Sequence, residues 1–315
     1  MGINHSAMGG SVWILATSTA PIALHLHPLG PTGVIAGALV SAGAALLADA
    51  DHHNASIAHS APGGRIVAGA VGAVSGGHRH GTHSLLALLL VTIGAIALGN
   101  LTIPGPGDST IPIGVGIATT MIVGFGLKAM KVLRGDWFKP FLGGAAVAVM
   151  VMVLAPDQWQ WFPWAVGIGY AVHLLGDFLT VGGLTLLWPW VPKPPKWWTA
   201  TPVLKHLWMK NGYMALPILG KAGSIVEYGL SMFFYVYFAY GIFYESTIIG
   251  TDAVNGFLAF WNQMWTDIGA WTDTKGQVHK ESSDSARYRA LGNSIAIPPW
   301  TYVLRRLSLF TGSAH

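Results

Sequence analysis

The chain has no cysteine among its 315 residues, which excludes disulfide bonds, thiolate metal sites and a cysteine nucleophile. Charged residues are also scarce: they make up 10% of the sequence, against about 25% in a typical soluble domain. Hydrophobic residues account for 52%. This composition predicts an integral membrane protein.

The first 64 residues contain no lysine or arginine, because the first such residue is Arg65. The chain therefore lacks the basic start of a cleavable signal peptide. Its net charge of +4 predicts no nucleic-acid partner, because basic residues in a membrane protein more often mark cytoplasmic loops. Such residues gather at 128–139 and 193–221. The positive-inside rule places these loops in the cytoplasm, and counting spans backwards places residues 49–83 there as well.

Apolar runs bounded by proline, glycine or charge predict an all-α, polytopic transmembrane helical bundle of about six or seven spans. The expected spans are 11–26, which is weakened by Pro21 and His25, and then 33–48, 85–103, 111–132, 141–155, 161–188 and 225–249. A further run, 66–74, is too short to cross a bilayer and is expected to be re-entrant or interfacial.

We expect three parts along the chain: a membrane-embedded metal-site domain over 1–222, an additional transmembrane helix over 223–250, and a tail over 251–315. Glu227 and Glu245 lie near the ends of the additional helix, where an interfacial position is the simplest interpretation. No proposed ligand lies in the tail, so its removal after Gly250 should leave the metal site intact.

Residues 76–84 read GGHRHGTHS and lead directly into an apolar run. Taken alone, this segment could be a solvated polar loop whose Thr82 caps the following helix, because a short histidine-rich tract is only a compositional hint of metal binding. Two other stretches carry the same chemistry. LLADADHH places acids and histidines after an apolar run, and His173 stands four residues before Asp177.

The spacing of His173 and Asp177 puts both side chains on one helix face, one turn apart. An ionisable pair at membrane depth is costly and indicates a functional site. Aspartate and neutral imidazole are ligands for zinc and similar borderline divalent metals. The sequence therefore predicts a metal site that includes this pair.

The strings NHSAMGG, LLADADHH, HRHGTHSLL and HLLGDFLTVGGLTLLWPW, in this order, resemble the YdjM family of bacterial and prophage membrane proteins over roughly residues 1–192. That family is described as membrane-bound metal-dependent hydrolases. Ala48 stands where the family usually has proline, and His80 occupies a variable position. The resemblance implies functional roles for His5, Asp49, Asp51, His52, His78, Arg79, Thr82, His83, His173, Asp177 and Thr180.

We therefore expect a metal-dependent hydrolase that acts at the cytoplasmic face on a lipid or lipid-linked substrate, such as a phosphoester. The expected metal ligands are His5, Asp49, Asp51, His52, His78, His83, His173 and Asp177. They exceed the three protein ligands of one catalytic zinc, so one or two divalent ions, with zinc favoured, are predicted. The expected catalytic residues are Arg79, Asp51 and Asp177.

Arg79 is expected either to clamp an anionic substrate group or to bind lipid headgroups as a surface arginine. Two other function classes stay open: a metal-binding transporter with His173 and Asp177 in a polar path, and a non-catalytic metal-stabilised scaffold. The remaining histidines are expected in loops or at interfaces: His25, His27, His53, His59 and His80. The expected location is the cell (inner) membrane, as a multi-pass protein encoded by a bacterium or a phage, and the oligomeric state stays open.

The tail contains an amphipathic stretch over 257–271, a polar stretch over 272–288, and a string over 285–307 that resembles the closing motif of cytosine-5 DNA methyltransferases. The glycine-rich cofactor motif of those enzymes is missing, and a chain without cysteine cannot supply their nucleophile. DNA methylation by this chain is therefore excluded.

Overall fold

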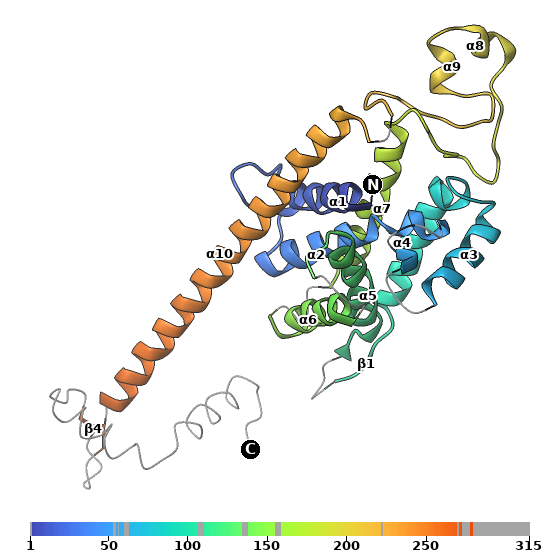
Figure 1. Cartoon of the computed structure of the whole chain (residues 1–315). Coiled ribbons are helices and arrows are strands. Elements are labelled where there is room, and N and C mark those ends of the chain that lie inside the picture. Colours follow the sequence, from blue (N-terminus) through green and yellow to red (C-terminus); the bar gives the residue numbers. More distant parts are fainter. Residues whose placement is uncertain are drawn as a thin grey trace. The chain divides into compact units, whose positions relative to one another are not determined.

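The computed structural model describes residues 2–52, 55, 57–59, 63–105, 110–133, 138–154, 159–221, 223–269, 271–272 and 278–279. Within these residues the chain is mostly helical, as the sequence predicts (Figure 1). It divides into two compact units, Met1–Ile249 and Gly250–His315. His53 and the methyltransferase-like string lie outside the described residues.

The longer helices are α1 (Gly2–Thr17), α2 (Pro31–Ala44), α3 (Gly64–Ser75), α4 (Leu85–Gly99), α5 (Ile113–Ala129), α6 (Phe138–Leu154), α7 (Phe162–Phe178) and α10 (Ile225–Gly269). Shorter helical pieces are η1 (Leu47–Asp51), η2 (Ile57–His59), η3 (Gly81–His83), α8 (Lys196–Ala200) and α9 (Leu204–Leu207). Two antiparallel pairs of two-residue strands complete the described elements: β1 (Ile103–Pro104) with β2 (Thr110–Ile111), and β3 (Trp271–Thr272) with β4 (Val278–His279).

Helix α2 lies at the centre of the first unit, where it packs against α1, α5, α6 and α7. Nearly all of its residues are buried, because glycine and alanine let neighbouring backbones approach closely. At Gly43 an added Cβ would collide with the carbonyl oxygen of Ile122 on α5. Larger side chains such as Trp13, Ile14 and Phe162 fill the core around this helix.

Helices α3 and α4 lie at the side of this core, and α4 packs against α7 (Figure 1). Their outward faces carry exposed apolar side chains, among them Ile66, Val74, Leu90 and Ile93. The expected short apolar piece at 66–74 forms the central part of α3. The connections between α2 and α4, which hold η1, η2 and η3, bring the polar motifs of the sequence to one end of the core.

Two expected spans differ from the observed helices. Helix α1 covers Gly2–Thr17 rather than 11–26, because Ser18 turns the chain by accepting a hydrogen bond from the Ala20 amide, and Pro21 follows. Helix α7 ends at Phe178 rather than continuing to Trp188. Beyond it the backbone turns at Gly183, which has a φ of 58°.

Two helical stretches of the described chain, Pro31–Asp51 and Ile225–Gly256, are long and apolar enough to cross a membrane. Four shorter apolar helices accompany them: Gly64–Ser75, Leu85–Gly99, Ile113–Ala129 and Phe138–Met152. Helix α10 contains the expected span 225–249 and continues as helix through Gly269.

The carboxylates of Glu227 and Glu245 are buried within the first unit, at 9% and 1% exposure, and their expected depth at the membrane interface stays a prediction. Glu227 accepts hydrogen bonds from the Asn4 amide at 3.1 Å and the Gly223 backbone amide at 2.6 Å. Glu245 accepts a bond of 2.6 Å from the Ser18 hydroxyl. The two donors on Glu227 offset part of the cost of burying its carboxylate, and Ser18 supplies one donor to Glu245.

Candidate metal centre

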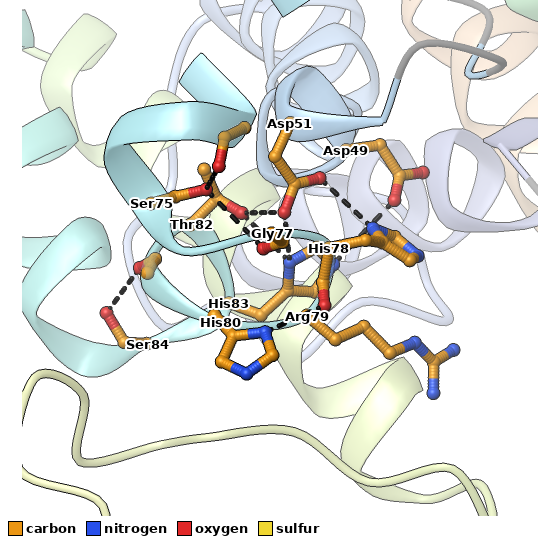
Figure 2. A network of polar contacts seen from close by, with 12 residues as sticks. Asp49, Asp51, Ser75, Gly77, His78, Arg79, His80, Thr82, His83 and Ser84 are labelled. Atoms are coloured by element: carbon orange, nitrogen blue, oxygen red, sulfur yellow. Dashed lines mark hydrogen bonds and ion pairs between the residues drawn. The ribbon is translucent and has the colours of Figure 1, made fainter. Parts of the chain in front are cut away.

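Four segments that are distant in sequence supply the polar side chains of the candidate centre. His5 comes from α1, Asp49 and Asp51 from η1, the histidines of residues 78–83 from the turn before α4, and His173 and Asp177 from the C-terminal half of α7. The turn is tight because Gly76 and Gly77 adopt positive φ angles of 82° and 104° after α3. Figure 2 shows Asp49 and Asp51 beside the loop that carries His78 and His83.

Four ligand atoms converge at the middle of the cluster: Asp49 Oδ1, His83 Nε2, His173 Nε2 and Asp177 Oδ2. His83 Nε2 lies 3.7 Å from Asp49 Oδ1, 3.5 Å from Asp177 Oδ2 and 3.3 Å from His173 Nε2. His173 Nε2 lies 3.7 Å and 3.8 Å from the same two carboxylate oxygens. Atoms that bind one zinc ion at about 2.0–2.2 Å are separated by roughly 3–3.6 Å. The separations of the two imidazole nitrogens from each other and from each carboxylate oxygen are therefore close to those of ligands around a single ion. Asp49, His83 and His173 form one group whose ligand atoms are all close enough for one ion.

The Nδ1 atoms of His83 and His173, which face away from the middle set, each form a hydrogen bond with an oxygen. His173 Nδ1 lies 2.6 Å from the carbonyl oxygen of Ala45, which can only accept, so this nitrogen carries the proton. The Thr82 hydroxyl donates to Asp51 Oδ2 at 2.6 Å and therefore accepts from His83 Nδ1 at 3.0 Å. Both Nε2 atoms face the cluster, and each presents a lone pair there when its ring is neutral, which is how metal-binding histidines are normally oriented.

Two flanking groups share residues with this middle set. On one side His5 Nε2 lies 3.8 Å from Asp177 Oδ1, and His5 and His173 stack with ring centroids 4.2 Å apart. On the other side His78 Nδ1 lies 3.1 Å from Asp51 Oδ1. The three overlapping groups with ligand atoms close enough for one ion are His5, His173 and Asp177; Asp49, His83 and His173; and Asp51, His78 and His83.

The cluster is buried on its inner side and partly open on its outer side. The side chains of His83 and His173 are 0% and 1% exposed, whereas those of Asp49 and His78 are 20% and 38% exposed. His52 lies at the open side, with its ring 4.5 Å from that of His78. Access to the middle set is therefore from the side of Asp49 and His78.

His83 stands in a strongly anionic environment. Burial alone lowers the pKa of an imidazole, but the carboxylates of Asp49 and Asp51, 3.7 and 3.6 Å from its ring nitrogens, together with Asp177, outweigh this effect and raise the pKa of His83 to about 9. In the metal-free protein His83 therefore carries a proton at neutral pH. A divalent cation that binds at Nε2 has to replace this proton.

Comparison with known proteins yields one match. Residues 1–248 match the model of the YdjM inner membrane protein family. The chain belongs to this family. No curated protein and no solved structure gives a further match.

Membership of the YdjM family establishes a membrane protein, in agreement with the composition and with the apolar helices. The match extends past residue 192, where the resemblance seen in the sequence ends, and includes the part of α10 that lies in the first unit. Glu227 and Glu245 are thus within the family region as well.

The donor set of this YdjM-family chain fits a divalent cation. With the imidazoles neutral, the carboxylates of Asp49 and Asp177 on either side of His83 and His173 carry a charge of −2, which one divalent ion neutralises. Two nitrogen and two oxygen donors suit a borderline metal such as zinc. The ring of His5 adds a buried Nδ1 without a hydrogen-bond partner, at the side of the cluster that faces Gly176.

Arg79 pairs with a residue of the middle set rather than pointing to solvent. Its Nη2 atom donates to Asp177 Oδ1 at 3.1 Å, and its Nη1 atom donates to the carbonyl oxygen of Gly183 at 3.3 Å. Its backbone has a φ of 63°, a left-handed conformation that is unusual for residues other than glycine. Gly182 leaves the space that the guanidinium occupies, because an added Cβ there would collide with Arg79 Nη1.

The expectation that Thr82 caps α4 is wrong. Ser84 is the N-cap, and its hydroxyl accepts a hydrogen bond from the Ala87 amide. Thr82 instead connects His83 to Asp51, as described above. Thr180 stays close to Asp177 but binds its backbone carbonyl oxygen, which closes the last turn of α7.

Three contributors to the cluster were missed in the sequence. Tyr170 is buried one turn before His173, and its hydroxyl donates to the carbonyl oxygen of Thr82. Helical spacing could have identified it, because residues 170, 173 and 177 share one face of α7. The Ala45 carbonyl and the pair of Asn4 with Glu227 depend on contacts between distant segments and have no local signal.

Proposed function

We propose that this chain binds a divalent metal ion, zinc or a similar borderline metal, through Asp49, His83, His173 and Asp177. We propose further that it hydrolyses an ester or phosphoester bond of a lipid or lipid-linked substrate at the cytoplasmic face. The observation that carries the proposal is that His83 Nε2 and His173 Nε2 lie 3.3 Å apart, each within 3.8 Å of an oxygen of Asp49 and of Asp177, with the Nδ1 atom of each ring bonded to an oxygen. When both imidazoles are neutral, two lone pairs face the two carboxylates, and a cation between them stabilises this arrangement.

A bound ion of this kind supplies Lewis-acid polarisation of a substrate oxygen and lowers the pKa of water. The residues around it perform the proton chemistry. Asp51 accepts from His78 Nδ1, which leaves His78 Nε2 free to take a proton from water at the open side of the cluster. Arg79 fixes the orientation of Asp177 and offers its remaining N–H groups to an anionic group of the substrate.

A position at one membrane surface is supported by the way the loops gather. The Lys128 ammonium, at the end of α5, donates to the carbonyl oxygen of His59 at 2.8 Å. The basic loop that begins there and the segment that supplies Asp49 and Asp51 therefore lie at the same end of the core. The positive-inside rule assigns that end to the cytoplasm.

Metal content and turnover of the purified full-length protein test the proposal. We expect stoichiometric divalent metal in the wild type, loss of that metal in His83→Ala, and full retention in the control His27→Ala, whose side chain is exposed in a loop away from the cluster. Metal-loaded protein should hydrolyse at least one class among phosphomonoester lipids, phosphodiester lipids and acyl esters. Chelation should abolish the activity and added metal should restore it.

The outcomes separate the function classes. Metal binding with no hydrolysis of any lipid class would contradict the hydrolase and favour the metal-stabilised scaffold. Metal-dependent uptake of the ion into sealed vesicles, without hydrolysis, would favour the transporter. Equal metal content in His83→Ala and His27→Ala would contradict the metal centre itself.

A further inference from the structure

A second feature of the first unit is an apolar groove of about 460 Å³ between α3 and α4. Val71 and Val74 of α3 line one side, Leu86 and Leu90 of α4 line the other, and Trp188 also contributes to the lining. The proposed hydrolytic mechanism assigns no task to this groove.

The groove borders on the candidate metal centre. Gly81 and Thr82 belong to its lining, and Thr82 bonds both Asp51 and His83. The Thr82 hydroxyl is thereby engaged by the cluster, so it is not available to a polar group in the groove. The same short segment thus contributes ligands on one side and an apolar wall on the other.

The surroundings of the groove indicate which kind of molecule it accepts. Val74, at its edge, is 83% exposed and Leu90 is 58% exposed, and Ile66, Val67 and Leu89 extend the apolar surface on the same two helices. In an inner membrane protein such a surface faces lipid. A narrow groove in a lipid-facing wall, with almost no polar lining, matches a hydrocarbon chain and offers no partner for the backbone or side chains of a polar peptide.

We propose that the groove between α3 and α4 binds one acyl chain of the substrate lipid and thereby places its headgroup ester at the open side of the metal centre. The placement of an ester there rests on the proposed function, whereas the binding of an acyl chain does not. A chain that is held along its length positions the scissile bond, so binding energy far from the reacting atoms contributes to catalysis.

Photocrosslinking tests the groove without any need for turnover. The probe is palmitoyl phosphatidic acid with a diazirine in the middle of the acyl chain, presented to the full-length protein in phosphatidylcholine nanodiscs. We expect crosslinks to concentrate on peptides from α3 and α4 that line the groove. Metal-free and metal-loaded protein should give the same pattern.

A matched pair of variants gives the comparison its control. Ala70 and Ala73 are both exposed on α3, but only Ala70 lines the groove. Ala70→Trp should fill the groove and reduce crosslinking there by roughly tenfold, which corresponds to about two methylenes displaced. Ala73→Trp should crosslink as the wild type does. Both variants should keep their metal, because neither residue contacts the cluster.

The results distinguish failure of the groove from failure of the hydrolase. Concentrated crosslinks that Ala70→Trp removes would support the groove even if no lipid is hydrolysed. Crosslinks spread evenly over the lipid-facing helices, or reduced equally in both variants, would overturn it even in an active hydrolase. In an active enzyme, an Ala70→Trp variant that hydrolyses long-chain and short-chain substrates in the wild-type ratio would also overturn it.

Discussion

Asp177 and Glu245 are both nearly fully buried, at 4% and 1% exposure, yet their surroundings differ completely. Asp177 is surrounded by three imidazoles and a guanidinium, with His83, His173, His5 and Arg79 all within 3.8 Å. Glu245 accepts a single hydrogen bond from the neutral hydroxyl of Ser18. Burial of a carboxylate therefore does not identify a functional acid. The chemistry of its neighbours separates a ligand from a helix-packing contact.

The largest expected effect comes from replacing Asp177 with its neutral isostere. Asp177→Asn keeps the size of the side chain but removes the charge that a divalent ion requires, so metal affinity should fall by more than about 100-fold. Equilibrium dialysis with quantified metal measures this loss. If Asp177→Asn bound metal as tightly as the wild type does, Asp177 would not be a metal ligand, and it would resemble Glu245 in having only a packing role.

The next effect is that of pH on metal binding. Because the pKa of His83 is raised to about 9, metal displaces a proton at neutral pH, and affinity should rise about tenfold per pH unit up to that value. The same protonation stabilises the metal-free fold: its contribution is complete below the unfolded pKa of 6.5 and is lost as pH rises through about 9. Chelator competition and thermal melts across this window should therefore show opposite slopes. A pH-independent affinity would contradict the role of His83 as ligand.

A smaller effect is expected at Arg79, which orients Asp177 without belonging to the middle set. Arg79→Ala should retain metal with roughly tenfold weaker affinity. It should also bind anionic lipid more weakly. Arg79→Lys should restore lipid binding only in part, because lysine lacks the bidentate fork of arginine. Gly182→Ala keeps the arginine but displaces its guanidinium. It should reproduce part of the Ala effect, and an unchanged Gly182→Ala protein would argue that the pairing with Asp177 is incidental.

The smallest effect is expected at Glu245. Glu245→Gln leaves a carbonyl oxygen to accept from Ser18, so metal affinity should stay unchanged and stability should change by less than about 1 kcal/mol. Differential scanning fluorimetry with metal analysis measures both. Loss of metal in Glu245→Gln, parallel to that in Asp177→Asn, would show that α10 contributes to the centre.

The sequence predicted those parts of the centre that depend on local spacing. His173 and Asp177 share one face of α7, and the histidines of the turn follow glycines that allow it to be tight. His5 and the start of α1 were harder to place. The N-terminal residues look like a polar, solvated start, and only packing against α2 and α7 makes them a buried helix.

The role of Thr82 also depends on a contact with a distant segment and could not be predicted from local sequence. Thr82 and Ser84 are both good N-cap residues by local preference, and they stand two positions apart before α4. Asp51, which is 31 residues away in the sequence, decides between them by accepting the Thr82 hydroxyl. Such long-range partners carry no local pattern, so the sequence predicts the residues of the centre more completely than it predicts their contacts.

The left-handed backbone at Arg79 has a consequence for how this protein tolerates mutation. Glycine would adopt a φ of 63° with less strain, by about 1 kcal/mol, than any residue with a Cβ. Glycine at this position would relieve that strain but would also remove the guanidinium that pairs with the buried carboxylate of Asp177. The backbone strain at Arg79 is therefore the local cost of holding a guanidinium against Asp177.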